Sequence, residues 1–179
     1  MNDILVMKFG GASLADINNF KIVADIIYKR SKHYKNLVVV VSAMADATDN
    51  LLKLAKQVHP SPPKREQDML ISVGERISMS LLAMALSKNG MEAISFTGSQ
   101  SGIITCCKHS NASIIDVKPK RIISNLQCGK IVIVAGFQGV SQKGEITTLG
   151  RGGSDTSAVA LAISLGATKV EFYKDVDGI

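Results

Sequence analysis

The sequence predicts a layered α/β fold built around a mainly parallel β-sheet. Short apolar runs rich in Val, Ile and Phe alternate along the chain with longer segments of helical periodicity. Most of these runs are nearly continuously apolar, as strands buried on both faces are. Strands that alternate with helices form parallel sheets through right-handed crossovers. The expected strands are Ile4 to Phe9, Leu37 to Val41, Ala93 to Phe96, Ile131 to Phe137 and Val170 to Tyr173.

Helical patterns lie between these strands, and most have a local signal at one end. Asp16 is a candidate N-cap of the first helix, Asn89-Gly90 a C-cap of the third, and Gly166 ends the fourth. The segment from Gly102 to Val117 is expected to be a small β excursion of the kind that covers a substrate. The expected helices are Ile17 to Ile27, Leu51 to Val58, Arg65 to Ala85 and Asp155 to Leu165.

Length and composition indicate one domain with a hydrophobic core. The chain has 179 residues, of which 46% are apolar, and this argues against disorder. No stretch approaches the roughly 18 to 20 consecutive apolar residues of a membrane helix, and the first residues lack the pattern of a signal peptide. We therefore expect a cytoplasmic protein with no membrane partner. Cys106, Cys107 and Cys128 have neither disulfide nor metal-ligand spacing.

The formal net charge of +6 favours an anionic partner. Nucleic acid is one candidate, and a small anion such as ATP or a carboxylic acid is another. The lysines are scattered, aromatic residues make up 4% of the chain, and no basic run has interleaved aromatic residues. Binding to a nucleic-acid backbone normally uses such runs, so small anionic ligands are the favoured interpretation.

The first glycine motif, Lys-Phe-Gly-Gly-Ala-Ser, runs from Lys8 to Ser13, where the first strand ends and a helix is about to begin. Gly10 and Gly11 let the backbone approach an anion with its N–H groups turned inward, and the following helix would direct its positive end there. Phosphate is the natural ligand. The lysine precedes the glycines, so this is not a Walker A loop. A turn required only for packing is the alternative.

The second glycine motif runs from Gly150 to Ala158 and also opens a helix. Arg151, among three glycines, can bind a carboxylate through two parallel hydrogen bonds, and Ser154 and Asp155 can cap the helix. A flexible turn followed by an ordinary cap is the alternative. Because the carboxyl ends of parallel strands meet at one edge of the sheet, the turns with Lys8 and Arg151 are expected to share one crevice.

Other polar residues in these regions have more than one interpretation. Asp155 could orient Lys8 or could serve only as a helix cap. Ser42 ends a strand beside small residues that leave room for a ligand, and Thr48 could offer a hydroxyl to that ligand or be a helix N-cap. For Glu75, in an apolar helical stretch, a surface salt bridge is the default interpretation on local grounds.

Five segments, in this order, resemble the aspartate kinases of the amino acid kinase family. Each is weak alone, but the ordered set is specific and spans nearly the whole chain. The resemblance implies a three-layer αβα sandwich with a mainly parallel central sheet. It also implies transfer of the γ-phosphoryl group of MgATP to the β-carboxylate of L-aspartate, the first step towards lysine, threonine and methionine. The segments are Lys8 to Ser13, Val41 to Met44, Gly74 to Arg76, Gly150 to Ala158 and Asp175 to Ile179.

The resemblance assigns roles to the matching residues. Lys8 would contact the phosphates and the transferred group, and Glu75 and Arg151 would face the amino group and a carboxylate of aspartate. The remaining residues fall into groups: Gly10, Gly11 and Ser13 in the phosphate loop, Ser42 and Thr48 beside the substrate, Ser154 and Asp155 at the reaction centre, and Tyr173, Asp175 and Asp177 at the start of the purine-binding segment.

The chemistry implied by the resemblance needs no catalytic histidine. A substrate carboxyl with a pKa of about 3.9 is already ionised at neutral pH, so it attacks without a general base. We therefore expect His33, His59 and His109 to be surface residues. Catalysis would consist of alignment and charge neutralisation, with Mg²⁺ held mainly by ATP and with no metal site on the protein itself.

The chain departs from the family pattern at Ala12 and Lys174, where threonine is usual, and it stops soon after its last expected strand. We expect an incomplete kinase domain, truncated on its C-terminal side, with an unfinished flank and without the rest of the nucleotide pocket or the regulatory domains. The segment alone should bind ATP weakly or not at all and show no feedback inhibition. The resemblance implies a homodimer for the full-length protein.

Two rival interpretations remain at this stage. One is a sister kinase that acts on glutamate or acetylglutamate. Glu75 argues against an acylated substrate, because a carboxylate facing the substrate favours a free amino group. The other is a nucleotide- or nucleic-acid-binding module without catalysis.

Overall fold

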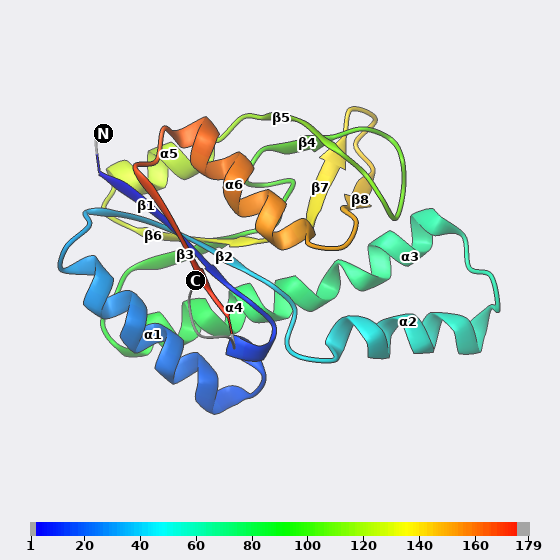
Figure 1. Cartoon of the computed structure of the whole chain (residues 1–179), viewed down its shortest axis with the longest axis horizontal. Helices are drawn as coiled ribbons and strands as arrows, with labels where there is room; N and C mark the ends of the chain where they lie inside the picture. The colour runs from blue at the N-terminus through cyan, green and yellow to red at the C-terminus, as the bar shows by residue number, and fades with distance from the viewer. Residues whose placement is uncertain (1–2, 175–179) are drawn as a thin grey trace.

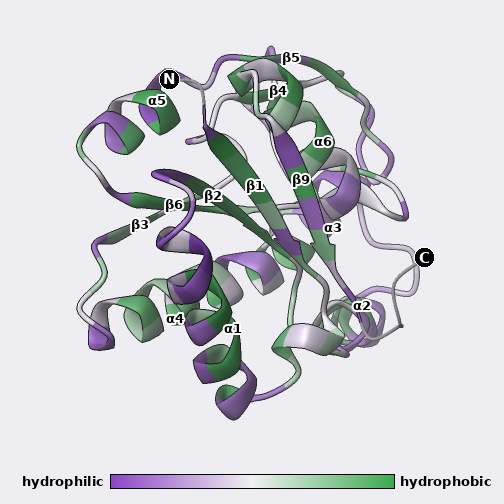
Figure 2. Cartoon of the chain, turned by 60° about the vertical axis from the view of Figure 1, so that its left-hand side comes forward, coloured by the Kyte–Doolittle hydropathy of each residue, from purple (hydrophilic) through white to green (hydrophobic). Residues whose placement is uncertain are grey.

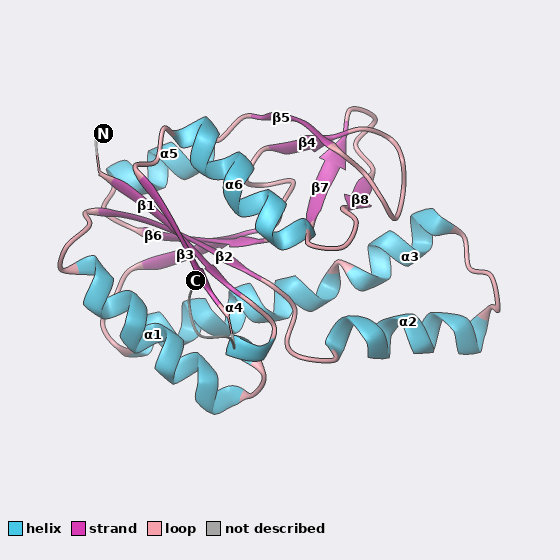
Figure 3. Ribbon diagram, viewed as in Figure 1, coloured by secondary structure: helices cyan, strands magenta, loops and turns pink. Residues whose placement is uncertain are grey.

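The computed structural model describes residues 3–174 and has two β-sheets with helices packed around them (Figures 1 and 3). The strands are β1 (Ile4–Phe9), β2 (Asn36–Val41), β3 (Ala93–Phe96), β4 (Ile103–Thr105), β5 (Ile114–Val117), β6 (Ile131–Ala135), β7 (Gln138–Ser141), β8 (Ile146–Thr148) and β9 (Lys169–Tyr173). The helices are the short 3₁₀ helix η1 (Ala12–Leu14), α1 (Ile17–Ser31), α2 (Ala47–Val58), α3 (Lys64–Ile71), α4 (Val73–Lys88), α5 (Lys120–Gln127) and α6 (Gly153–Leu165).

The central sheet has five parallel strands in the order β3-β6-β2-β1-β9. Every residue of β1, β2 and β6 is buried, as the continuous apolar runs predicted. β9 lies at one edge, all of its residues are exposed or half-buried, and Figure 2 shows it as more hydrophilic than β1. All five predicted strands are therefore present, in one parallel sheet.

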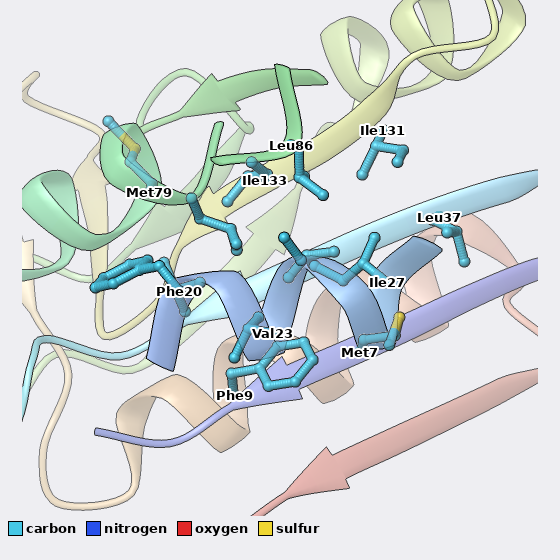
Figure 4. Close-up of a cluster of buried hydrophobic side chains, with 14 of the residues drawn as sticks. Met7, Phe9, Phe20, Val23, Ile27, Leu37, Met79, Leu86, Ile131 and Ile133 are labelled. Carbon is cyan, nitrogen blue, oxygen red and sulfur yellow. The ribbon is translucent and has the colours of Figure 1, made fainter. Parts of the chain in front are cut away.

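Helices cover both faces of this sheet, which confirms the three-layer αβα sandwich. α1 and α4 pack on one face and α5 and α6 on the other (Figure 1). β1 contributes alternate residues to the two cores: Leu5, Met7 and Phe9 face α1 and α4 (Figure 4), whereas Ile4 and Val6 face α6. Each fully buried side chain of this size contributes roughly 1.5–3 kcal/mol, so the two cores hold β1 in one register.

The second sheet is small and mixed, with the order β5-β4-β7-β8. β4 and β5 confirm the predicted β excursion, and they pair with the hairpin of β7 and β8, which the sequence did not signal. This sheet lies at the same end of the molecule as the α2 and α3 pair (Figure 1). α3 contacts β8, so the excursion is joined to the helices beside the carboxyl edge of the central sheet.

Three details differ from the sequence prediction. The third helical pattern is divided at Ser72 into α3 and α4, and Ser72 is both the C-cap of α3 and the N-cap of α4. The helix α5 was not predicted, because its eight residues bury little more than Ile122 and Leu126. The strand expected to reach Phe137 ends at Ala135, and Phe137 adopts a left-handed backbone with φ 65°.

The stretch Lys64–Lys88, formed by α3 and α4, is 25 residues long and apolar enough to cross a membrane by length and composition alone. However, 44% of its most apolar window is buried inside the protein. Met79, Leu82 and Leu86 pack into the core, and Asp68 and Glu75 are buried carboxylates. These features favour a core helix of a folded domain.

Candidate active site

A cavity of about 300 Å³ opens at the carboxyl edge of the central sheet. Ligand sites of open α/β sheets lie at this edge, beyond the ends of the strands. The turns after β1, β2, β6 and β8 all reach the cavity, so Lys8 and Arg151 share one crevice as predicted. The predicted reason holds only for Lys8, because the Arg151 turn follows β8 of the second sheet and not a strand of the parallel central sheet. Its lining consists of Lys8, Gly11, Ser42, Ala43, Ala45, Thr48, Glu75, Phe137, Gly150, Arg151, Gly152, Gly153, Ser154 and Asp155.

Lys8 is a buried cation at the carboxyl end of β1, on the face that packs against α6. Its side chain is 8% exposed, and its Nζ lies 2.7 Å from Asp155 Oδ1. Lys174 Nζ lies 3.1 Å from the other oxygen of the same carboxylate. Burial raises the pKa of Asp155, but Lys8 and Lys174 outweigh burial and leave this pKa below its ordinary value. Asp155 is therefore ionised at neutral pH and orients Lys8, the first of its two predicted roles.

The turn that carries Arg151 opens α6. Gly152 occupies the N-cap position with φ 77°, a left-handed conformation that a residue with a side chain adopts only with strain. Ser154 and Asp155 lie in the first turn of α6, and no side chain caps that helix. The Arg151 residue is exposed, and its guanidinium has no hydrogen bond or ion pair to any residue within 3–174. Its donors can therefore bind a ligand without first breaking a contact of this kind.

The positive helix end at this cavity belongs to α6 and not to α1. The sequence predicted that the helix after Gly10 and Gly11 would direct its N-terminus at a phosphate. Instead, the glycines lead into η1, and the carboxylate of Asp16 accepts the N–H groups of Asn18 and Asn19 at the start of α1. The N-cap prediction for Asp16 is confirmed. However, the Asp16 carboxylate already accepts the N–H groups at the start of α1 to which a phosphate would bind. Gly153, Ser154 and Asp155 of α6 line the cavity directly.

Glu75 is a buried acid, so the surface salt bridge expected from its local sequence is wrong. The residue is 3% exposed; its Oε1 accepts the Ala43 N–H at 3.2 Å, and its Oε2 has no protein partner within residues 3–174. Burial raises the pKa of Glu75 to about 7, against the smaller opposing effect of the backbone N–H groups of Glu75 and Ala43. A cationic ligand group would satisfy Oε2 and stabilise its charge.

Gly74 brings Glu75 close to the turn after β2. A β-carbon at Gly74 would lie 2.8 Å from the Ala43 side chain, so only glycine allows α4 to approach this closely. Ser42 lies half-buried at the same turn and donates its backbone N–H to Phe9 O. Thr48 is the second residue of α2 and makes no capping bond, which disfavours the N-cap alternative. Both Ser42 and Thr48 line the cavity, as predicted for substrate-binding residues.

Three described residues of the predicted nucleotide site do not line this cavity: Gly10, Ser13 and Tyr173. Gly10 N and Ser13 Oγ both donate to Tyr173 O, at 3.1 and 3.3 Å. The Tyr173 ring stacks on Phe9, and its hydroxyl donates to Glu171 at 2.7 Å. These residues join β9 to the glycine turn. Asp175 and Asp177, also predicted for this site, lie outside the described residues.

Sequence reasoning missed some residues of the site. Phe137 lines the cavity, and its N–H donates to Ser157 Oγ at 3.1 Å, which joins the end of β6 to α6. The signal was Gly136-Phe137, a glycine after a buried strand at the same edge of the sheet.

His109 was expected on the surface, as were His33 and His59, which are exposed. Instead, the His109 side chain is 20% exposed and bonds to the buried Asp68 at 2.8 Å.

The fold is an α/β fold, and its cavity offers charges of both signs to a ligand. Lys8, Arg151 and the N-terminus of α6 offer positive charge, and Glu75 offers a buried carboxylate. The chain belongs to the amino acid kinase family, whose model matches residues 3–179.

Curated relatives of this chain are named aspartokinase. The aspartokinase of Mycobacterium tuberculosis (strain ATCC 25618 / H37Rv) is 56% identical over 177 residues, which are 98% of this chain and 42% of that protein. The chain thus spans less than half the length of the curated relatives that it matches.

The solved structures to which this chain is similar also include aspartate kinases. The aspartate kinase from Synechocystis superposes with a TM-score of 0.84 at 45% identity, over 98% of this chain and 28% of that chain. The aspartokinase III of E. coli, solved in complex with aspartate and ADP, superposes with a TM-score of 0.87 at 27% identity, over 99% of this chain and 50% of that chain.

Proposed function

We propose that this chain is part of an aspartate kinase, which transfers the γ-phosphoryl group of MgATP to the β-carboxylate of L-aspartate and forms 4-phospho-L-aspartate. This would be the first step towards lysine, threonine and methionine. The observation that carries the proposal is Glu75 Oε2, which has no partner in the described part of the chain and lies in the same cavity as Lys8 and Arg151. Such a cavity suits an amino acid that presents an ammonium group and carboxylates together. The names of the relatives support the same substrate.

In this proposal the substrate binds through ion pairs and hydroxyl contacts. Arg151 binds a carboxylate of aspartate through its forked N–H groups, and Glu75 binds the ammonium group. Ser42, Thr48 and Ser154 supply hydroxyls at the walls of the cavity. The ammonium group would also lower the pKa of Glu75 and so keep it ionised.

Lys8 neutralises charge during transfer. The attacking carboxylate and the γ-phosphate repel each other, and a buried lysine between them reduces this repulsion where solvent screening is weak. Asp155 keeps Lys8 aligned, and the N–H groups at the start of α6 offer further donors. No proton has to be removed from the attacking oxygen, so alignment and electrostatics do the catalytic work.

We assign Mg²⁺ to the nucleotide as part of the substrate MgATP. Asp155 is the acidic residue next to Lys8, and its two oxygens are already paired with Lys8 and Lys174. Within residues 3–174, no group of three or more His, Cys, Asp or Glu side chains is placed to hold a metal ion. Phosphate oxygens are the preferred ligands of Mg²⁺ in such substrates.

The rest of the nucleotide site and of the domain belongs, in this proposal, to a longer protein. Gly10, Gly11 and Ser13 would form the phosphate turn, with Tyr173, Asp175 and Asp177 at the start of the purine-binding segment. The edge strand β9 and the outer face of α6 carry exposed apolar side chains, namely Phe172, Val159 and Ile163, which suits a flank covered by further chain.

We further propose a cytoplasmic homodimer that binds neither nucleic acid nor membrane, with feedback control residing in domains outside this segment.

The activity is tested with the full-length protein that contains this segment. Incubation with MgATP and L-aspartate, followed by hydroxylamine, should give aspartyl hydroxamate, because hydroxylamine traps acyl phosphates. Lys8→Ala should reduce kcat by roughly 100-fold or more, since it removes charge stabilisation at the transferred group. Lys35→Ala, at an exposed lysine, is the matched control and should leave the rate unchanged.

Parallel reactions with L-glutamate and N-acetyl-L-glutamate decide the substrate. Hydroxamate from either of these acids but none from aspartate would move the assignment to a sister kinase. Nucleotide binding without any acyl phosphate from the three acids would instead favour a non-catalytic module.

A further inference from the structure

Asp68, in α3, is a fully buried carboxylate that lies outside the cavity. The residue is 0% exposed and does not line the cavity. Its two oxygens accept hydrogen bonds from Thr148 Oγ1 at 2.6 Å and from the Thr148 N–H at 3.2 Å. They also accept the Ser110 N–H at 3.0 and 3.1 Å and interact with His109 Nδ1 at 2.8 Å. A buried carboxylate is stable only with partners of this kind.

The partners of Asp68 come from two segments that are distant in sequence. Ser110 and His109 belong to the loop between β4 and β5, and Thr148 is the last residue of β8. The Ala112 N–H donates to Thr148 O at 2.9 Å, so the two segments are also joined to each other. Asp68 thus fixes both segments to α3, the helix that leads through Ser72 into the helix of Glu75.

Thr148 leads directly into the turn that carries Arg151. Leu149 is 3% exposed and donates its N–H to Phe137 O, so the chain has little freedom between Thr148 and Gly150. A β-carbon at Gly150 would lie 2.4 Å from Asn111 Oδ1, so the loop after Ser110 also packs against the turn. The Arg151 guanidinium has no partner within residues 3–174 that could hold it. Its location is therefore set by the backbone of the turn, which Asp68 anchors.

We propose that Asp68 is a positioning residue for the acidic substrate: by holding Thr148 and Ser110, it fixes the turn that presents Arg151 to a substrate carboxylate. This inference rests on the proposed function only for the identity of the acid. It predicts that loss of the Asp68 network weakens binding of the acid more than binding of the nucleotide. A displacement of about 1 Å in such a turn can change binding and catalysis by up to 100-fold.

The test combines Asp68→Asn with a matched pair at Thr148. Asp68→Asn keeps the shape of the side chain but replaces one acceptor oxygen with a donor, which faces N–H and O–H donors. Thr148→Val replaces the hydroxyl with a methyl group, and Thr148→Ser retains the hydroxyl. Glu66→Gln, on the exposed face of α3, is the control.

In the full-length protein, KM for the acid should rise roughly 10- to 100-fold in Asp68→Asn and by a smaller factor in Thr148→Val. KM for MgATP should stay within about twofold of the wild-type value, and Thr148→Ser and Glu66→Gln should behave like the wild type. Equal increases in both KM values, or an unchanged KM for the acid in folded Asp68→Asn, would overturn the inference. If Asp68→Asn does not fold, the Thr148 pair decides by the same criterion.

Amide hydrogen exchange separates failure of this inference from failure of the proposed function. Asp68→Asn or Thr148→Val should accelerate exchange at residues 148–153 and leave β1 protected, whichever acid is the substrate. If aspartate is not phosphorylated, the kinetic comparison is made with the acid that is. Unchanged exchange at residues 148–153 in both variants would show that the network does not hold the turn.

Discussion

At the scale of single residues, the cavity is defined by which charges are paired and which are left for a ligand. Asp155 is paired twice, with Lys8 and with Lys174, the residue that stands where the family usually has threonine. Glu75 is paired once and keeps one oxygen without a protein partner in the described part of the chain. Buried acids of this second kind destabilise a protein unless a ligand satisfies them, and they are typical of functional sites.

Glu75→Gln should stabilise the ligand-free protein near pH 8. The folded-state pKa of Glu75 is raised to about 7, above its unfolded value of 4.5, so the protonated form is favoured in the native state. The stability contributed by this proton is full below pH 4.5 and is lost as the pH rises to about 7. The variant should therefore gain on the order of 3 kcal/mol at pH 8 and nothing at pH 4, as measured by urea unfolding at both pH values.

The same substitution should weaken binding of the proposed substrate. KM for aspartate in the wild type should rise as the pH falls below about 7, because a protonated Glu75 no longer attracts an ammonium group. In Glu75→Gln, KM for aspartate should be high at every pH between 6 and 8. If Glu75→Gln is more stable at pH 8 but binds aspartate as tightly as the wild type, Glu75 does not contact the substrate.

At the scale of elements, the site depends on how strands end and helices begin. The sequence predicted the strand ends at Phe9 and Val41 correctly, because buried parallel strands read as continuous apolar runs. It was right that the N-terminus of α6 reaches the cavity but wrong that the N-terminus of α1 does, because Asp16 could be recognised as an N-cap while the intervening η1 could not. For Glu75, local sequence alone suggested a surface salt bridge, because it does not show that Gly74 packs against Ala43, on a distant segment; the family resemblance placed Glu75 at the substrate, and Glu75 lines the cavity.

The turn at the start of α6 gives a prediction with a matched control. Gly152 and Gly144 both have positive φ, 77° and 82°, and a β-carbon would meet no atom within 4 Å at either position. Gly152→Ala and Gly144→Ala should each cost about 1 kcal/mol of stability through backbone strain alone. Only Gly152→Ala should also raise KM for the acid, because Gly152 follows Arg151 directly. If the two variants have the same KM for the acid, the turn at Gly152 does not contribute to substrate binding.

At the scale of the whole molecule, the two faces of the sheet are covered to different extents. α1 and α4 form an extensive core with the strands, whereas α6 is apolar on its outer face as well as its inner one. The layer order and the location of the Lys8 and Arg151 cavity at the carboxyl edge of the sheet could be predicted from the pattern of strands and helices and from the family resemblance. The second sheet could be predicted only in part, because three- and four-residue strands carry too little periodicity to be recognised.

The exposed face of α6 can be tested for a covering partner within a longer protein. Ile163 is 78% exposed, so Ile163→Lys should change the stability of the isolated segment by no more than about 0.5 kcal/mol. In the full-length protein the same change should cost about 2 kcal/mol or more, because it would bury a charge, as measured by chemical unfolding. Val58→Lys, at an 89% exposed residue of α2, should have little effect in either protein. If Ile163→Lys does not destabilise the full-length protein, the outer face of α6 is not covered there and the prediction is wrong.

The location of β1 has a consequence for synthesis of the protein. Of the strands in the central sheet, β1 is synthesised before the others, yet its two hydrogen-bonded neighbours are β2, which follows soon, and β9, which is made far later. Until α6 and β9 emerge, Lys8 has no carboxylate partner and one edge of β1 has no neighbour. A nascent chain with an unpaired edge of this kind is prone to mispairing, and long-range parallel pairing is slow. The residue that is proposed to stabilise the transferred phosphoryl group therefore reaches its buried ion pair only late in synthesis.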